Sequence, residues 1–247
     1  MDYSTVADDF FVNLDLQTTL ALPESRETIL HFCETVQKEF AEMTSFYQRD
    51  TGQYVLEGDR DGGSYQWMEL QAHQLSAGHF NPPDIESAYA LHSWLLERVV
   101  YFLGISGLDV EALDLLFGFN MDFVGNRDEI VAEALLAGSP LSALVSEHPV
   151  RTVEFEPNFV VAVSEDCYTQ ARLSVETRCD SYQIRTGKYS DEPISLYFTI
   201  RRYPSAGSVL DLQESFRRQC ELAEDMLERV VIPNVAEPIA ALILSGR

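Results

Sequence analysis

Hydrophobic and polar residues alternate near the start of the chain, over the stretch from Phe10 to Thr18. Successive side chains of an extended strand point to opposite faces, so this pattern predicts a half-buried β-strand. The apolar face carries Val12, Leu14 and Leu16, and the polar face carries Asn13 and Asp15. We therefore expect one face of this strand to pack in the core and the other to meet solvent or a ligand.

A helical pattern follows Ser25, because apolar residues then recur every three or four positions as far as Phe40. A second, longer helix is predicted from Ile85 to Leu103. Turn-forming residues between the two helices predict three strands, over residues 44–49, 53–58 and 64–75. The first half of the chain is therefore interpreted as a β-α-β-β-β-α unit.

The second half repeats this plan with longer strands. A strand is predicted over residues 115–124, followed by a helix over residues 127–137 that Asn126 could cap and a further turn or two reaching Val145. Further strands are predicted over residues 152–156, 159–165, 170–178, 181–186 and 194–203. A helix is predicted over residues 210–231, and the prolines at 233 and 238 are expected to separate it from a short final helix.

Short segments of the two halves match in the same order. Val12-Asn13-Leu14-Asp15-Leu16 resembles residues 119–123, Ser76-Ala77-Gly78 recurs at 205–207, and Leu96-Glu97-Arg98-Val99-Val100 recurs at 227–231. Ordered self-similarity of this kind indicates an ancient duplication. We therefore predict two repeats, residues 1–107 and residues 108–247, and no Pro, Gly/Ser or charged linker separates them.

The predicted fold class is α+β: a tandem duplication of the β-α-β-β-β-α unit that forms a pseudo-twofold single-chain dimer. Strand-rich units with few helices commonly place the helices on one face of an antiparallel sheet. The polar strand faces of the two repeats would then meet near the pseudo-twofold axis. A cleft at that position is where we expect a ligand.

Charge narrows the choice of partner. The 247 residues include 17 Lys and Arg against 40 Asp and Glu, a net charge of −23. Direct binding of nucleic acid is disfavoured, because it requires clustered basic residues. An acidic surface can serve solubility alone, attract a basic partner, or imitate a nucleic acid.

The sequence also favours a cytosolic location. No apolar run approaches the ~20 residues that a membrane helix needs, and the first residues are acidic, unlike a secretory signal. The four cysteines are scattered without any C-x-x-C pair, so we expect reduced thiols. We therefore expect no contact with a membrane.

Two copies of the Asn-x-Asp step are the first candidate site. Asn13 with Asp15, and Asn120 with Asp122, would each present an amide and a carboxylate on the polar face of a strand. Brought to one cleft, these groups would suit a cationic ligand, a divalent cation or acid–base chemistry. The alternative is that they are solvated polar positions of two half-buried strands.

A second candidate set lies on the last strand before each long helix. Trp67 in the first half, with Tyr197 and Arg201 in the second, would place aromatic rings beside a guanidinium group. Such a surface is suited to a planar or anionic small molecule, through stacking and paired hydrogen bonds. The alternative is ordinary cross-strand packing of aromatic and charged residues.

Sequence signatures of catalysis are missing. The chain contains no G-x-G-x-x-G, no phosphate-binding loop, no G-x-S-x-G and no H-E-x-x-H. We therefore predict no catalytic residue, no metal and no cofactor. The leading hypothesis is a non-catalytic binding or interaction protein with a basic or unfolded protein client. The alternatives are a small-molecule-binding or metal-binding protein or an enzyme with its site in the cleft between the repeats, and a nucleic-acid mimic.

Overall fold

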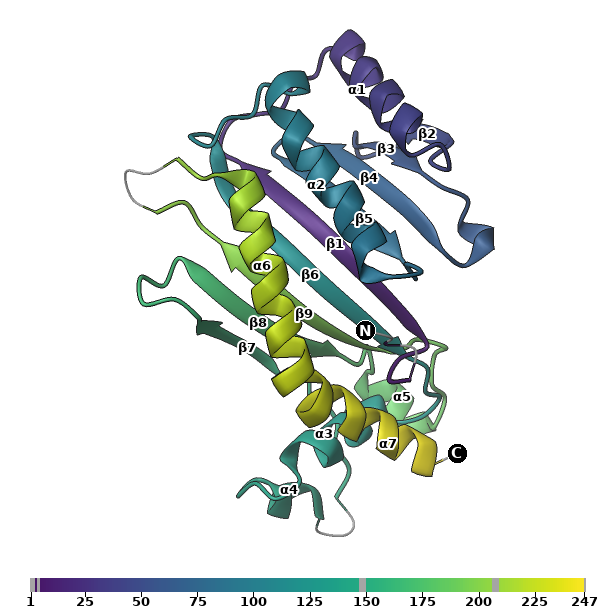
Figure 1. Ribbon diagram of the computed structural model, residues 1–247. Helices are drawn as coiled ribbons and strands as arrows, with labels where there is room; N and C mark the ends of the chain where they lie inside the picture. The colour runs from purple at the N-terminus through teal and green to yellow at the C-terminus, as the bar shows by residue number, and fades with distance from the viewer. Residues whose placement is uncertain (1–2, 4, 147–149, 206–208, 247) are drawn as a thin grey trace.

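The computed structural model describes residues 3, 5–146, 150–205 and 209–246. Its strands form one nine-stranded antiparallel sheet in the order β2-β3-β4-β5-β1-β6-β9-β8-β7 (Figure 1). From the first edge to the last, the strands are β2 (Ser45–Gln48), β3 (Tyr54–Glu57), β4 (Tyr65–Gln71), β5 (Gln74–Phe80), β1 (Asp9–Thr18), β6 (Val110–Met121), β9 (Ile194–Arg202), β8 (Thr169–Glu176) and β7 (Asn158–Ala162). The α+β class and the antiparallel sheet predicted from the sequence are thus confirmed.

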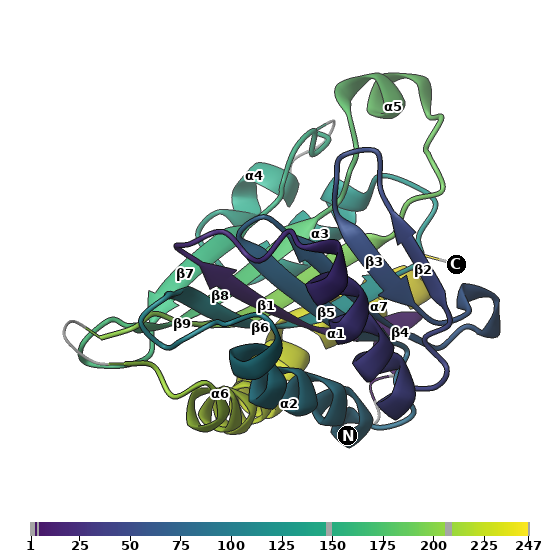
Figure 2. The same ribbon diagram turned by 90° about the horizontal axis from the view of Figure 1, so that it is seen from above.

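Three helices, α1, α2 and α6, lie on the same side of this sheet (Figure 2). The α-helices are α1 (Arg26–Glu39), α2 (Ile85–Phe102), α3 (Arg127–Leu136), α4 (Ser142–Ser146), α5 (Ser181–Thr186), α6 (Leu212–Met226) and α7 (Glu237–Ser245). The two long helices begin at aspartate caps: the Asp84 carboxylate accepts the N–H of Ser87, and the Asp211 carboxylate accepts that of Glu214.

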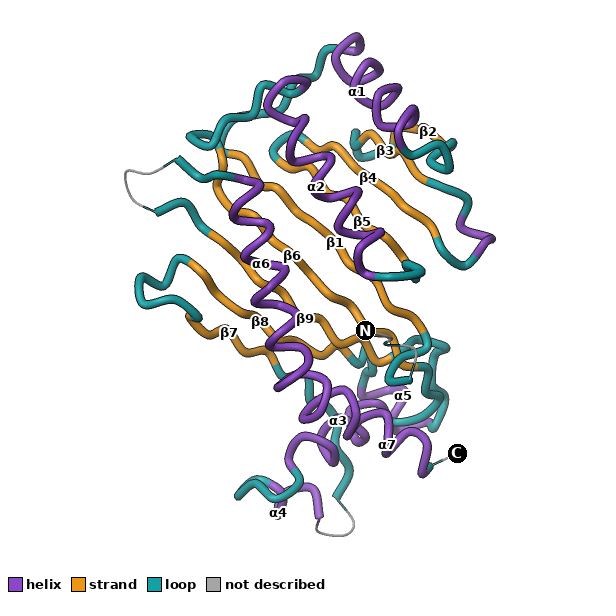
Figure 3. Tube along the Cα trace, viewed as in Figure 1, coloured by secondary structure: helices purple, strands orange, loops and turns teal. Residues whose placement is uncertain are grey.

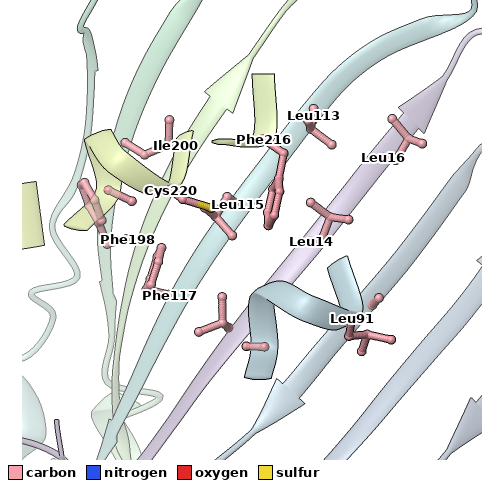
Figure 4. Close-up of a cluster of buried hydrophobic side chains, with 14 of the residues drawn as sticks. Leu14, Leu16, Leu91, Leu113, Leu115, Phe117, Phe198, Ile200, Phe216 and Cys220 are labelled. Atoms are coloured by element: carbon pink, nitrogen blue, oxygen red, sulfur yellow. The ribbon is translucent and has the colours of Figure 1, made fainter. Parts of the chain in front are cut away.

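The core lies between the sheet and helices α2 and α6 (Figure 4). The alternation predicted for β1 is confirmed, because Val12, Leu14 and Leu16 are fully buried while Asn13 and Asp15 are only partly buried. The adjacent strand β6 contributes Leu113, Leu115, Phe117 and Phe119 to the same core. Burying these side chains provides the main driving force for the fold.

The two predicted repeats meet at the β1–β6 strand pair. Leu14 lies opposite Leu115, and Asp15 lies opposite Asp114, in one continuous antiparallel register. On the outer side of this pair, β1 is bonded to β5 and β6 is bonded to β9. The junction is therefore the middle of a single sheet, with hydrogen-bonded strands where the sequence predicted a cleft.

One predicted strand is in fact a hairpin. The single strand expected over residues 64–75 is divided by a turn at Ala72 and His73, and Gln71 pairs with Gln74 across it. The second arm, β5, then runs on to Phe80. The turn contains no Gly, Pro, Asn or Asp, so the sequence lacked the usual signal for it. The first unit therefore has one strand more than predicted.

The strand predicted over residues 181–186 is the short helix α5. The Asp180 carboxylate accepts the N–H groups of Tyr182 and Gln183, both at 2.8 Å, and Gly187 ends the helix with a φ of 67°. An aspartate at the start and a glycine just after the end are ordinary helix signals. No strand forms over residues 152–156, which are irregular.

The prolines near the C-terminus do not separate two helices as predicted. A π-helical segment, Leu227–Ala236, joins α6 directly to α7 and contains Pro233 (Figure 3). Its wider turns use hydrogen bonds five residues apart, such as the one from the Glu237 N–H to the Ile232 C=O. Pro233, which has no N–H to donate, is accommodated in this looser ladder.

The matched segments do not all lie at comparable positions in the fold. Residues 12–16 lie within β1, whereas residues 119–123 begin with the last three residues of β6 and extend past its end. Leu96–Val100 and residues 227–231 both lie in the helical stretch that follows the last strand of their half. Ser76 and Gly78 lie within β5, whereas Ser205 lies beyond the end of β9 and residues 206–207 fall outside the described part of the chain. Among the described residues, no helix has the length and apolar character needed to span a membrane.

Candidate functional site

The sheet face opposite α2 and α6 has no helix over its central strands in the described part of the chain (Figure 2). We call it the uncovered face. Because side chains alternate along each strand, the pairing register fixes which residues share it. On β4, β5, β1, β6 and β9 it includes Tyr65, Trp67, Glu69, Ser76, Gly78, Phe80, Phe11, Asn13, Asp15, Asp114, Leu116, Gly118, Asn120, Ser195, Tyr197, Thr199 and Arg201.

A row of aromatic side chains crosses the uncovered face. The ring centroids of Tyr65 and Phe80 are 5.3 Å apart, and those of Phe80 and Phe11 are 6.1 Å apart, both in stacked arrangements. The Tyr197 ring meets Phe11 edge to face at 6.3 Å. These distances favour mutual attraction of the rings. The row therefore spans β4, β5, β1 and β9 and passes over β6.

Two glycines make room for these rings in the middle of the sheet. A Cβ atom at Gly78 would collide with the Asn13 Oδ1 and with the indole of Trp67, and one at Gly118 would collide with the Phe11 ring. Trp67 and Phe11 thus lie flat against the backbone of the neighbouring strands. Glycine is required here because of this close approach.

A groove of about 330 Å³ lies over the first-half part of this face. Its lining includes Asn13, Trp67 and Phe80, together with the four residues of two ion pairs. The ion pairs join Arg49 to Glu69 at 3.0 Å and Arg60 to Glu57 at 2.6 Å. The Asn13 Oδ1 is buried and has no hydrogen-bond partner among the described residues. An unpaired buried acceptor is costly, so a donor from a ligand would stabilise it.

A polar cluster lies beside the groove, where β1 pairs with β6. The Asp15 carboxylate accepts hydrogen bonds from Ser76 Oγ at 2.5 Å and Gln74 Nε2 at 2.8 Å. Asp114, directly opposite, is held by two hydrogen bonds from Arg201. Burial raises the pKa of Asp114 above its ordinary value, Arg201 opposes this rise, and the charge of Asp15 adds to it.

The structure brings most of the predicted site residues onto this face but divides them. Asn13 and Trp67 border the groove, and Asp15 and Arg201 belong to the polar cluster. Asn120 accepts a hydrogen bond from Ser195 at 2.7 Å, near the strand ends. Tyr197 lies at the end of the aromatic row and accepts a hydrogen bond from Arg178 at 2.8 Å.

Asp122 lies apart from its predicted counterpart. It is exposed, it follows the last residue of β6, and its N–H donates to Asp8 at 2.7 Å. Asp114 is the residue opposite Asp15, and eight residues of extended chain span about 26 Å. The two Asn-x-Asp steps therefore do not present their carboxylates to one ligand.

Several residues of the face were not identified from the sequence. Phe11 lies within the alternating stretch and falls on the same face as Asn13, but it was not singled out because that face was read from its polar residues. Gly78 and Phe80 were not identified because the predicted strand ended at residue 75, so most of β5 was assigned to no strand. Asp114 gave no signal, since only the pairing of β1 with β6 places it beside Asp15.

The described residues contain no group of three or more His, Cys, Asp or Glu side chains arranged to hold a metal ion. Their four cysteines form no disulfide: Cys33 and Cys220 are buried, and Cys167 is exposed. Burial raises the pKa of both Cys33 and Cys220 to about 12. Neither of these two buried thiols is therefore suited to act as a nucleophile.

Comparisons with known proteins give no family for this chain. No protein-family model matches it, and no curated protein matches it. One solved structure that it resembles is described as the di-domain ARO/CYC BexL from the BE-7585A biosynthetic pathway. The two are 6% identical with a TM-score of 0.23, over 94% of this chain and 98% of that one. We take neither fold nor function from a likeness at this level.

Proposed function

We propose that this chain is a non-catalytic binding protein that holds a polypeptide segment of a partner protein against the uncovered face. The aromatic row, together with Trp67 in the groove beside it, is the observation that supports this most directly. Aromatic side chains supply large contact areas with little loss of conformational entropy on binding. A partner segment with apolar or aromatic side chains could pack on these rings.

Charge supports a basic partner. Residues 1–125 contain 5 basic and 21 acidic residues, a net charge of −16, against 12 basic and 19 acidic residues, a net charge of −7, in the remainder. The groove lies in this more acidic half. An acidic surface around an apolar groove would speed the approach of a basic partner and contribute less to its final affinity.

We also propose that the two halves arose by duplication. The strand order supports this. The first strands of the two halves, β1 and β6, lie side by side at the centre of the sheet, and the strands that precede the long helices, β5 and β9, are their outer neighbours. The Ser-Ala-Gly match does not contribute, because its two copies lie in different places. The reduced cysteines support the cytosol as the location.

A pull-down from native lysate at moderate salt tests the proposed function. The wild type, Trp67→Ala and Tyr101→Ala would be used as baits, because Tyr101 is an aromatic residue on α2 that is 84% exposed. We expect a partner that binds the wild type and Tyr101→Ala and is lost with Trp67→Ala. Equal recovery with all three baits, or no partner together with turnover in a substrate screen, would contradict the proposal.

A second candidate function is binding of a small planar molecule in the same groove. The unpartnered Oδ1 of Asn13, a residue that lines the groove, favours it, and the volume of 330 Å³ is at the lower end of known ligand pockets. Native mass spectrometry of protein purified without denaturation would show a bound mass, and Asn13→Ala should release it. A nucleic-acid mimic is less well supported, because Glu57, Glu69 and Asp114 are paired with arginines.

A further inference from the structure

The edge strand β7 has backbone groups that face outward. Within the described residues it pairs only with β8. On that side the Val163 N–H donates to β8 at 2.9 Å, and the Pro157 C=O accepts from β8 at 3.0 Å. Because bonded positions alternate along an antiparallel strand, the residues between them direct their N–H and C=O groups away from β8. These outward residues are Asn158, Val160 and Ala162.

The side chains of β7 are unusual for an edge strand. Phe159, Val160 and Val161 are 62%, 57% and 53% exposed, and the strand contains no charged residue and no proline. Monomeric proteins commonly protect sheet edges with lysine, proline or bulges, because an apolar edge pairs with other chains. Val153, shortly before the strand, is also 50% exposed. This edge therefore has the properties of an interface.

We propose that β7 pairs with β7 of a second copy of this chain, antiparallel about a twofold axis at Val160. In that register Val160 lies opposite Val160, and Asn158 lies opposite Ala162, so all the outward N–H and C=O groups find partners. Phe159 then lies opposite Val161 at non-bonded positions, where side chains approach closely. The interface is self-complementary, as a twofold dimer requires.

The distribution of charge favours a second copy at this edge. Strand β7 lies in the half with a net charge of −7, and β2, in the half with −16, lies at the other edge. Nine strands at ~4.8 Å spacing separate the edges by about 38 Å, which is several Debye lengths in physiological salt. Pairing through β7 thus keeps residues 1–125 of one copy, the more acidic half, far from the same residues of the other copy. A basic peptide would find no opposite charge on β7 itself, because this strand contains no charged residue.

Dimerisation would also extend the binding surface. Val160 shares the uncovered face with Arg172, Thr199 and Leu116, according to the register across β8, β9 and β6. Since the twofold axis runs perpendicular to the sheet, the uncovered faces of both copies would lie on the same side. The inference does not depend on the proposed function, since it rests on β7 alone.

Sedimentation velocity of the full chain tests the proposal with two matched variants. Val160→Pro removes an outward N–H and leaves the bonds to β8 intact. Phe46→Pro makes the same change on the opposite edge, because the Arg49 N–H bonds to Gln53 and Phe46 is therefore an outward position of β2. We expect a dimer at about 100 µM for the wild type and Phe46→Pro, and a monomer for Val160→Pro.

Hydrogen exchange of the wild type provides a second measurement that needs no variant. The amides of residues 158–162 should exchange more slowly at about 100 µM than at about 1 µM. A monomeric wild type at the higher concentration, or a dimer that Val160→Pro leaves intact, would overturn the proposal. So would concentration-independent exchange in this strand, or protection that appears only when another protein is added.

Discussion

His92 offers the sharpest test of the packing between α2 and the sheet. Its side chain is fully buried, and neither ring nitrogen has a hydrogen-bond partner among the described residues. The ring meets Phe216 of α6 edge to face at 6.0 Å. Burial lowers the pKa of His92 to about 3, the nearby His79 contributes in the same direction, and the backbone of Ala77 opposes the shift. His92 is therefore neutral in the folded protein.

The stability of the protein should depend on pH through this residue. The unfolded chain binds a proton at His92 below its ordinary pKa of 6.5, whereas the folded protein binds one only near pH 3. Stability linked to His92 is thus fully present above pH 6.5 and is lost as the pH falls toward 3. Between pH 7 and pH 5 these two pKa values give a loss of about 2 kcal/mol in the free energy of unfolding.

Urea unfolding at pH 7 and at pH 5, at constant ionic strength, measures this loss. We expect His92→Leu to lose about 2 kcal/mol less than the wild type between the two pH values. The variant should be at least as stable at pH 7, because it removes two unpaired buried polar atoms. His73→Gln is the control, because it replaces a histidine that lies exposed in the β4–β5 turn.

Equal losses in the wild type and in His92→Leu would refute the reasoning, because His92 would then be hydrated or hydrogen-bonded in solution. A large destabilisation of His92→Leu at pH 7 would also contradict it. That result would mean that the imidazole makes a contact that an apolar side chain cannot replace.

Three further outcomes can be checked by equilibrium unfolding. Gly78→Ala should lower the free energy of unfolding by about 1–3 kcal/mol, because the new methyl group displaces the indole of Trp67 from the sheet. The same displacement should shift the tryptophan fluorescence emission to longer wavelength. Arg127→Met should lower the free energy of unfolding by about 3 kcal/mol or more, because the fully buried guanidinium of Arg127 donates hydrogen bonds to the carbonyl groups of residues 177, 178 and 190. Limited proteolysis of this variant should then cleave within residues 177–190. Asp114→Asn should change the free energy of unfolding by less than about 1 kcal/mol at pH 7, because the charged partner that Arg201 loses is offset by removing a carboxylate whose burial raises its pKa.

Local patterns of the sequence determined much of the secondary structure. The alternation around Leu14 predicted β1 and its buried face, and the apolar spacing after Ile85 predicted α2. These features depend on side-chain direction along one segment, which residue order alone specifies. The helix α5 could also have been found, because Asp180 and Gly187 are its capping residues.

Other elements depended on contacts that no local pattern contains. The turn at Ala72 lacks turn-forming residues, and the pairing of β5 with β1 holds it in place. The π-helical segment around Pro233 persists because Val231 and Val235 are buried. Packing of this kind outweighs the cost of a looser hydrogen-bond ladder.

The candidate site shows the same division. The sequence by itself determined that Asn13 and Asp15 share the polar face of a strand. Only the tertiary structure decided that Asp15 lies opposite Asp114 and not near Asp122, and that the rings of Trp67 and Phe11 lie over glycines of other strands. Neighbours across a sheet are set by the order and register of strands distant in the chain, and this long-range choice leaves no periodic signal in the sequence.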